Sequence, residues 1–284
     1  MPSLSPTASA HAAAVRQRCA GKTLDLPLLP EVAHKVRSAT RNPEGDALTL
    51  ANVIRRDAAF AGYLLRVANS PAYAARAPST SLQQAVSRLG LRTIGEIAIV
   101  IACSTRAFAV KGHEGTVRAL FRHALATALY AREIARLRRL NVEDAFLAGL
   151  LHDVGRPTVI QALVDQQTVT SLPLLSPVEF DLVVSDLHEE VGAEIILAWT
   201  LPMRLAESIR HHHDPERASG DCRPMAALLA LADDLSHFAV PLRRVTEEGL
   251  HAHPAAGLLN LYPEEIVALV ARASQIVSQV DGLS

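Results

Sequence analysis

The sequence has few cysteines and few aromatic residues, and neither sign of charge is in excess. Aromatic residues make up 4% of the 284 positions, and the three cysteines stand far apart at Cys19, Cys103 and Cys222. This odd, widely spaced set argues against a disulfide framework and a zinc–thiolate site, and it favours a reducing, cytoplasmic location. The 28 basic and 29 acidic residues give a net charge of −1. A global positive field that would hold nucleic acid or an anionic membrane is therefore excluded.

Long hydrophobic runs are also missing. The longest candidate stretch, Ile97 to Thr105, ends at Arg106, which is well short of the ~20 residues that a membrane-spanning helix requires. We therefore expect no membrane partner. The N-terminus lacks the charged start and the long apolar run of a signal peptide, and we expect residues 1–23 to form a flexible tail.

The apolar residues follow a helical spacing from Leu28 onward, without the sustained alternation of a half-buried strand. The sequence therefore predicts an all-α fold. At ~150 residues per domain, the length predicts two lobes. We place an N-terminal helical lobe at 24–112 and a second helical lobe, with the C-terminal helices, at 113–284.

Caps and helix breakers divide this pattern into separate helices. Gly90 is placed to end one helix in a left-handed conformation, and an apolar helix is expected over about 93–108. Asn141 can cap a helix that reaches about His152. Ser176–Glu179 is a capping box with proline at the first helical position, and Asp186–Glu189 has the pattern of a second box that would begin another helix.

The dipeptide His152-Asp153 sets an imidazole beside a carboxylate at the end of an apolar helix, where Gly155 permits a sharp turn. Adjacent helical residues point about 100° apart, so both can reach one metal ion only where the helix ends. The alternative is ordinary helix capping, which is the commoner role of such a pair.

Two further polar residues fall on or beside apolar helical faces. His123 lies at the edge of the buried stripe of a long helix over roughly 114–139, and Asp233 shares a face with Leu229 and Ala230. A buried carboxylate must be paired or bound to metal because an isolated buried charge is too unfavourable. The alternative is that Asp233 or Asp234 is exposed and pairs with His237 one turn later. We expect His123, His152, Asp153 and Asp233 to converge.

A histidine, then His-Asp, then a late aspartate, all on helices, resembles the HD superfamily of metal-dependent phosphohydrolases. Further stretches of the chain are informative as well: Leu26–Val32, Ala51–Asp57, Leu64–Ser70, Ser81–Gly90, Ala148–Gly155, His188–Ala193, Trp199–Pro202 and His211–Pro215. Together they narrow this resemblance to the HDOD family, over about residues 24–235.

The resemblance implies an N-terminal helical lobe packed on an HD-like lobe, and a signalling or regulatory role in bacteria. It implies a basic ligand set of His123, His152, Asp153 and Asp233, while His188 and one of His212 or His213 match the extra histidines of the related HD-GYP phosphodiesterases. Such groups would hold one or two divalent ions, with Mn, Fe, Ni, Zn or Mg as candidates. If the site is catalytic, Asp153 is the decisive residue because it is placed to touch both ions.

The sequence also departs from these relatives. Arg156 stands where the His-Asp-x-Gly-Lys motif has lysine; it keeps the charge near the site but cannot donate a proton. The histidine run is followed by Asp214-Pro215-Glu216-Arg217 instead of a Gly-Tyr-Pro segment. These departures argue against the substrate of the HD-GYP enzymes.

Three functions remain open. The first, which we favour, is a regulatory module that retains the HD-like site and acts through a signalling protein partner. The second is a metal-dependent phosphohydrolase or phosphodiesterase acting on a nucleotide or a cyclic dinucleotide. The third is a sensor in which a nucleotide ligand occupies the site. A nucleic-acid partner is not expected.

Overall fold

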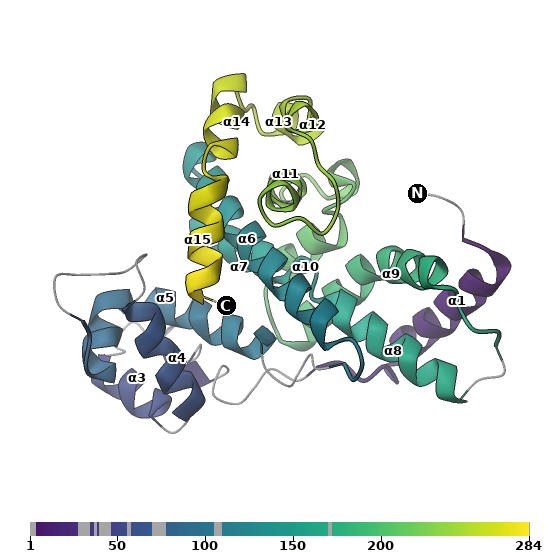
Figure 1. The fold of residues 1–284 in the computed structure, drawn as a ribbon, viewed down its shortest axis with the longest axis horizontal. Helices are drawn as coiled ribbons and strands as arrows, with labels where there is room; N and C mark the ends of the chain where they lie inside the picture. Colours follow the sequence, from purple (N-terminus) through teal and green to yellow (C-terminus); the bar gives the residue numbers. More distant parts are fainter. Residues whose placement is uncertain are drawn as a thin grey trace. The chain divides into compact units, whose positions relative to one another are not determined.

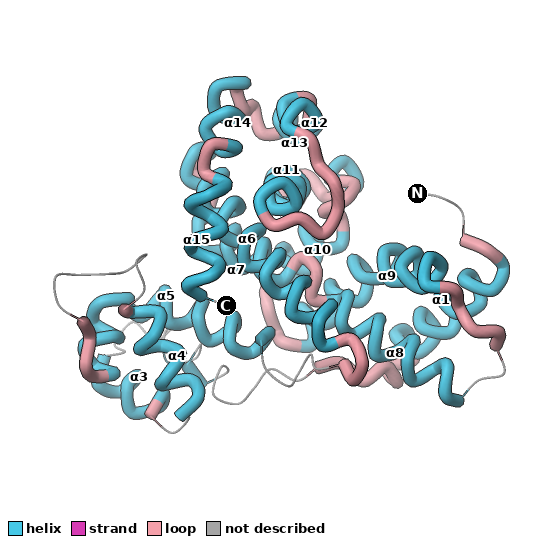
Figure 2. Tube along the Cα trace, viewed as in Figure 1, coloured by secondary structure: helices cyan, strands magenta, loops and turns pink. Residues whose placement is uncertain are grey.

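A computed structural model describes residues 4–27, 35–36, 39, 47–55, 58–69, 78–104, 110–169 and 172–283. The described residues form helices and connecting loops, with no strand among them (Figures 1 and 2). The all-α prediction is confirmed. No helix within these ranges combines the length and the apolar character needed to cross a bilayer.

The helices are α1 (Pro6–Ala20), α3 (Ala47–Ile54), α4 (Ala58–Ala68), α5 (Leu82–Ser104), α6 (Glu114–Arg138), α7 (Val142–Leu151), α8 (Gly155–Val169), α9 (Pro177–Ala198), α10 (Met203–Arg210), the 3-10 turn η2 (Pro215–Arg217), α11 (Arg223–Ala239), α12 (Glu247–His251), α13 (Pro254–Leu258), α14 (Pro263–Val270) and α15 (Ala273–Leu283).

Contacts divide the chain into two units. Unit 1 comprises Met1–Pro27 and Phe108–Val270, and unit 2 comprises Leu28–Ala107 and Ala271–Ser284. Our division from the sequence kept all C-terminal helices with residues 113–284, whereas the contacts group α15 with unit 2. Each unit is described below by itself.

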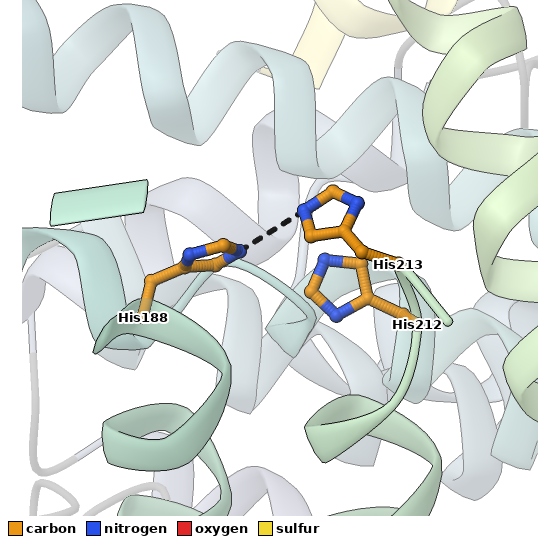
Figure 3. A group of neighbouring side chains, drawn as sticks. All are labelled: His188, His212 and His213. Carbon is orange, nitrogen blue, oxygen red and sulfur yellow. Dashed lines mark hydrogen bonds between the residues drawn. The ribbon is translucent and has the colours of Figure 1, made fainter. Parts of the chain in front are cut away.

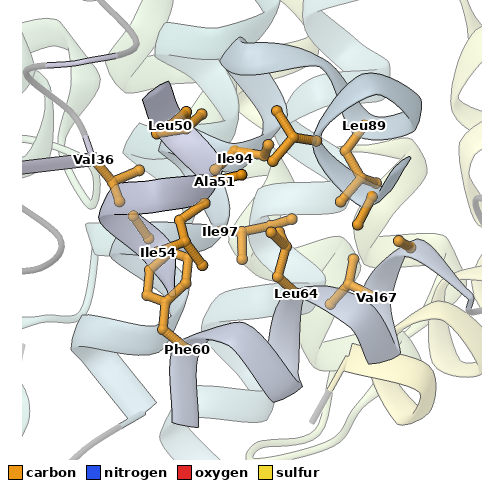
Figure 4. Close-up of a cluster of buried hydrophobic side chains, with 14 residues drawn as sticks. Val36, Leu50, Ala51, Ile54, Phe60, Leu64, Val67, Leu89, Ile94 and Ile97 are labelled. Atoms are coloured by element: carbon orange, nitrogen blue, oxygen red, sulfur yellow. The ribbon is translucent and has the colours of Figure 1, made fainter. Parts of the chain in front are cut away.

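Unit 2 has a core formed by α3, α4 and α5, which pack against one another. Its buried side chains include Phe60, Leu64 and Ile94 (Figure 4). Gly90 interrupts α5 with a φ of 79°, a left-handed value that favours glycine, as its position in the sequence predicts. The helix expected over 93–108 is the second part of α5, which ends at Ser104; residues 105–109 lie outside the described residues.

The expected flexible tail is wrong for most of its length, because residues 6–20 form α1. Ser5 caps this helix by accepting a hydrogen bond from the Ala8 amide, and Pro6 occupies the first turn. The side chains of Ala12 and Val15 are buried in the packing of α1 on α9. Small alanine side chains permit such close packing and favour helix, so an alanine-rich start was mistaken for an unstructured one.

The second capping box is also wrong as a helix start. Asp186–Glu189 lies inside α9, which begins at the confirmed capping box of Ser176 and Glu179 and continues to Ala198. Val183, Leu187 and Val191 form one buried stripe through this segment, so the apolar period continues without a break.

Two glycines allow the site-bearing helices of unit 1 to approach closely. A Cβ atom on Gly149 would lie 2.7 Å from the Ala128 Cα, so this residue permits the contact of α7 with α6. A Cβ atom on Gly155 would lie 2.1 Å from the His188 carbonyl oxygen, so Gly155 permits the contact of α8 with α9. Gly155 therefore serves close packing, and not only a turn.

Candidate metal centre

His123 lies fully buried on α6, not at the edge of the buried face. Its Nε2 atom is 2.7 Å from the Asp233 Oδ1 atom on α11, and its Nδ1 atom is 2.6 Å from the Ser236 hydroxyl oxygen. The Thr127 hydroxyl donates to the His123 carbonyl oxygen at 3.0 Å and lies 2.9 Å from the Ser236 hydroxyl. These contacts fix the His123 ring on both nitrogens.

Three other histidines share one local geometry. His152, His188 and His212 each place Nδ1 at 2.7–2.8 Å from the carbonyl oxygen of the residue three positions earlier. Since a carbonyl only accepts, each Nδ1 carries the proton and donates it, which leaves Nε2 with the lone pair in the neutral ring. The buried Nε2 atoms of His152 and His212 have no hydrogen-bond partner among the described residues.

The ring charges differ between these histidines. Burial lowers the pKa of His188 to about 3, with the Arg156 cation adding to the effect. Burial also lowers the pKa of His212 well below its ordinary value. For His152 burial acts in the same direction, but the carboxylates of Asp153 and Asp233 outweigh it and raise the pKa. His188 and His212 are therefore neutral near pH 7, as metal ligands must be.

Asp153 lies between two groups of histidines. Its Oδ2 atom is 3.5 Å from the His152 Nε2 atom, and its Oδ1 atom is 3.4 Å from the His188 Nε2 atom. Arg156 places its Nε atom 2.7 Å from Oδ2. Burial opposes ionisation, but Arg156, His152 and His188 outweigh it and hold the pKa of Asp153 well below its usual range. The carboxylate is therefore charged even though Asp153 is buried, with only 6% of the residue exposed.

His188, His212 and His213 form the second group (Figure 3). The Nε2 atoms of His188 and His213 are 3.2 Å apart. His212 is fully buried, whereas His213 is exposed. The sequence left open which of the two adjacent histidines faces the site, and the structure brings both to it.

Asp233 rather than Asp234 joins the centre. Its Oδ1 atom lies 2.7 Å from the His123 Nε2 atom and 3.4 Å from the His152 Nε2 atom. Burial opposes its ionisation, but the hydrogen bond from His123 and the adjacent His152 ring outweigh burial and hold the pKa of Asp233 well below its usual range. Asp234 instead forms an ion pair with Arg243 and lies 3.5 Å from the His253 Nε2 atom.

Sequence reasoning missed several neighbours of this centre. Ser236 anchors His123, and His237 lies 3.5 Å from the Asp233 Oδ1 atom; His237 had entered only as a salt-bridge partner. Arg243 contacts the other Asp233 oxygen at 3.4 Å. Burial raises the pKa of Glu189 to about 7, and its carboxylate accepts from the His213 amide at 3.2 Å. Of these residues, only His237 had a signal in the sequence, which was its spacing of four residues from Asp233.

A cavity of about 700 Å³ adjoins the centre, within the range of ~300–1,000 Å³ that is common for small-molecule sites. Its walls combine charged or polar side chains with apolar ones. They include His212, His213, Asp233, Asp234, Glu216, Arg243, His253, Ala230, Pro254 and Leu258.

Together these groups fit a divalent ion. Three sets of ligand atoms each lie within 4.8 Å of one another: His123 with His152 and Asp153, His123 with Asp233 and His237, and His188 with His212 and His213. The donors are imidazole nitrogens and carboxylate oxygens, which suit first-row divalent metals. Buried Nε2 atoms without partners are otherwise unfavourable, and an ion would satisfy them.

The HDOD domain model matches residues 26–215 of the chain. The chain belongs to the HDOD family. A solved HDOD domain protein of unknown function from Geobacter sulfurreducens is 25% identical and superposes with a TM-score of 0.73, over 97% of this chain and 99% of that one. A candidate metal-dependent phosphohydrolase from Shewanella amazonensis SB2B shares the fold at a TM-score of 0.74 with 20% identity, over 97% and 100% of the two chains.

Two curated proteins are similar in sequence. An uncharacterised protein from Treponema pallidum (strain Nichols) is 25% identical over 224 residues, which is 75% of this chain and 42% of that protein. Ribonuclease Y of Thermus thermophilus is 30% identical over 129 residues, which is 45% of this chain and 18% of that enzyme. This HDOD chain therefore matches less than half the length of either curated relative.

Proposed function

We propose that this HDOD protein is a regulatory module that binds one or two divalent metal ions at the histidine–aspartate centre and acts through a signalling protein partner. The observation that carries the metal-binding part of this proposal is the shared hydrogen bond of His152, His188 and His212 from Nδ1 to a backbone carbonyl. This bond fixes the ring orientation and leaves Nε2 for a metal, as in many metal-bound histidines.

Two sets of donors would hold the ions. One set consists of His123, His152, Asp153 and Asp233, and the other consists of Asp153, His188, His212 and His213. Mn, Fe, Ni, Zn and Mg are the candidates. A bound divalent ion would supply a Lewis acid that polarises a phosphate oxygen and lowers the pKa of a bound water. Arg156 keeps Asp153 ionised and oriented between the two sets through its ion pair.

The test is the metal content of the protein purified without chelator, measured by inductively coupled plasma mass spectrometry. We expect one or two equivalents of a divalent metal in the wild type. Asp153→Asn keeps the shape but removes the charge, so it should lose most of this metal and keep the fold. The matched control is Asp144→Asn, which alters an aspartate whose ion-pair partner is Arg204.

The outcome that contradicts the proposal is a wild type that neither retains nor takes up Zn²⁺ or Mn²⁺. Equal metal content in wild type and Asp153→Asn would remove Asp153 from the ligand set. Circular dichroism of both variants shows whether a loss of metal reflects a loss of fold.

A metal-dependent phosphohydrolase is the second candidate function. The position of Asp153, within 3.5 Å of histidines of both sets, suits a carboxylate that bridges two metal ions. The similarity to a ribonuclease and to a candidate phosphohydrolase agrees with this candidate. Arg156 in place of lysine, and the absent Gly-Tyr-Pro segment, oppose it for cyclic dinucleotides.

Turnover assays separate the two functions. We expect no robust hydrolysis of cyclic dinucleotides by the Mn²⁺-loaded or Zn²⁺-loaded wild type. Metal-dependent hydrolysis that Asp153→Asn abolishes would instead establish the enzyme. Saturable nucleotide binding without turnover would favour the sensor.

A further inference from the structure

His237 lies at the centre but belongs to neither donor set above. It stands one helical turn after Asp233 on α11, and 8% of the residue is exposed. Its ring stacks on that of His123, with the ring centroids 4.1 Å apart. Its Nε2 atom faces the Asp233 carboxylate, and its Nδ1 atom has no hydrogen-bond partner among the described residues.

Three imidazole nitrogens converge on one oxygen. The Nε2 atoms of His123, His152 and His237 lie 2.7, 3.4 and 3.5 Å from the Asp233 Oδ1 atom. Donors bound to one ion at ~2.1 Å stand about 3.0 Å apart at right angles and about 3.4 Å apart in a tetrahedron. The distances of His152 and His237 are close to those of ligands that share an ion, whereas the 2.7 Å contact of His123 is a direct hydrogen bond to the same oxygen.

A simple salt bridge explains His237 less well. A charge-assisted hydrogen bond from an imidazolium to a carboxylate is ~2.7–2.9 Å long, and His123 already makes such a contact with the same oxygen. The exposed pair of His251 and Glu247 has the same spacing of four residues and a distance of 3.7 Å. Both of its side chains are substantially exposed, so its geometry is that of a surface pair.

We propose that His237 is an additional ligand of the ion held by His123, His152 and Asp233, and that it closes this position to water. The inference rests on the proposed metal site and deepens it. Metal sites in which protein donors fill every position are structural, whereas catalytic sites keep an open one. The position at His188, His212 and His213, where His213 is exposed, is then the more open of the two.

The experiment titrates metal-free protein with Co²⁺ and Zn²⁺ and follows visible absorption and affinity. Three proteins are compared: wild type, His237→Gln, and the matched control His251→Gln. We expect His237→Gln to weaken the tightest site at least ~10-fold and to change the Co²⁺ absorption, while the control matches the wild type. Chelator should remove the ion at this position from the wild type slowly, and this slow phase should be lost in His237→Gln.

A second variant reports coordination directly. His237→Cys places a thiolate at the same position, and a thiolate bound to Co²⁺ gives an intense charge-transfer band in the near ultraviolet. We expect this band with one equivalent of Co²⁺. If His237→Gln does not fold, the band in His237→Cys still tests whether the side chain at this position binds the ion.

The outcomes separate the two proposals. If the wild type binds metal but His237→Gln keeps its affinity and spectrum, or folded His237→Cys shows no charge-transfer band, His237 is not a ligand and this inference is overturned. If the wild type binds neither Co²⁺ nor Zn²⁺, the proposed metal site itself is wrong.

Discussion

Gly155 offers a direct test of how packing positions the centre. An added Cβ atom at this residue would lie 2.1 Å from the His188 carbonyl oxygen and 2.7 Å from the Gly192 amide nitrogen. Both neighbours are backbone atoms of α9, so neither can move away by a side-chain rotation. Because ordinary van der Waals contacts to a Cβ atom begin near 3.4 Å, Gly155→Ala must separate α8 from α9 by roughly 1 Å.

This displacement has two expected consequences. Overpacking of this kind destabilises a protein by ~1–3 kcal/mol, which lowers the Tm by several degrees for a chain of this size. The displaced backbone also carries His188, whose Nε2 atom lies 3.4 Å from Asp153. Metal–ligand distances vary by only ~0.2 Å, so we expect the Zn²⁺ affinity of the donor set that contains His188 to fall at least ~10-fold.

Thermal unfolding followed by circular dichroism, with calorimetric Zn²⁺ titration below the Tm, measures both effects. The control is Gly115→Ala on α6, where an added Cβ atom meets nothing within 4 Å. The reasoning is refuted if Gly155→Ala unfolds at the wild-type temperature and binds Zn²⁺ as tightly as the wild type.

Three further predictions concern buried groups. Tyr130 is fully buried and its hydroxyl has no hydrogen-bond partner among the described residues. Tyr130→Phe should therefore raise the free energy of unfolding by ~1 kcal/mol in denaturant titration. A loss of stability would instead show that the hydroxyl forms a hydrogen bond. Ser236→Ala removes the hydroxyl that contacts the His123 ring and should weaken metal binding ~10–100-fold, as measured by calorimetry. Unchanged affinity would show that Ser236 does not position His123 for the metal. Val15→Ala should destabilise the protein by about 2 kcal/mol in denaturant titration because packing of α1 on α9 is lost. Its neighbour Arg16 serves as the control: Arg16→Ala should change stability by less than ~1 kcal/mol because its ion pairs are partly exposed. A larger loss of stability in Arg16→Ala than in Val15→Ala would contradict the packing of α1.

The histidine–aspartate pattern was readable from sequence because each residue breaks an apolar helical context. His152 and Asp153 follow an apolar helix, and Asp233 interrupts one. Their convergence depends on which helices pack together, and the family resemblance supplied that information. His237 was visible only as a partner of Asp233 one turn away, because its contact with His123 on α6 is a tertiary one.

Local signals also failed where tertiary contacts decide the structure. α1 has a weak sequence signal because its buried face consists of Ala8, His11, Ala12 and Val15, with a single large apolar side chain, and it is held by packing on α9. The capping-box pattern at Asp186–Glu189 was overridden because a continuous buried stripe extends α9 through it. The close contact of Gly155 with the α9 backbone involves residues more than 30 positions later in the chain. From the sequence, only the tendency of Gly155 to form a turn was apparent.

The most direct measurement of the central claim is anomalous diffraction from a crystal of the Zn²⁺-loaded protein at wavelengths on either side of the zinc absorption edge. The account predicts a peak within bonding distance of His123, His152 and Asp233, and, if two ions bind, a second peak at His188, His212 and His213. An absence of anomalous density at both positions in a crystal of the zinc-soaked protein would contradict the account.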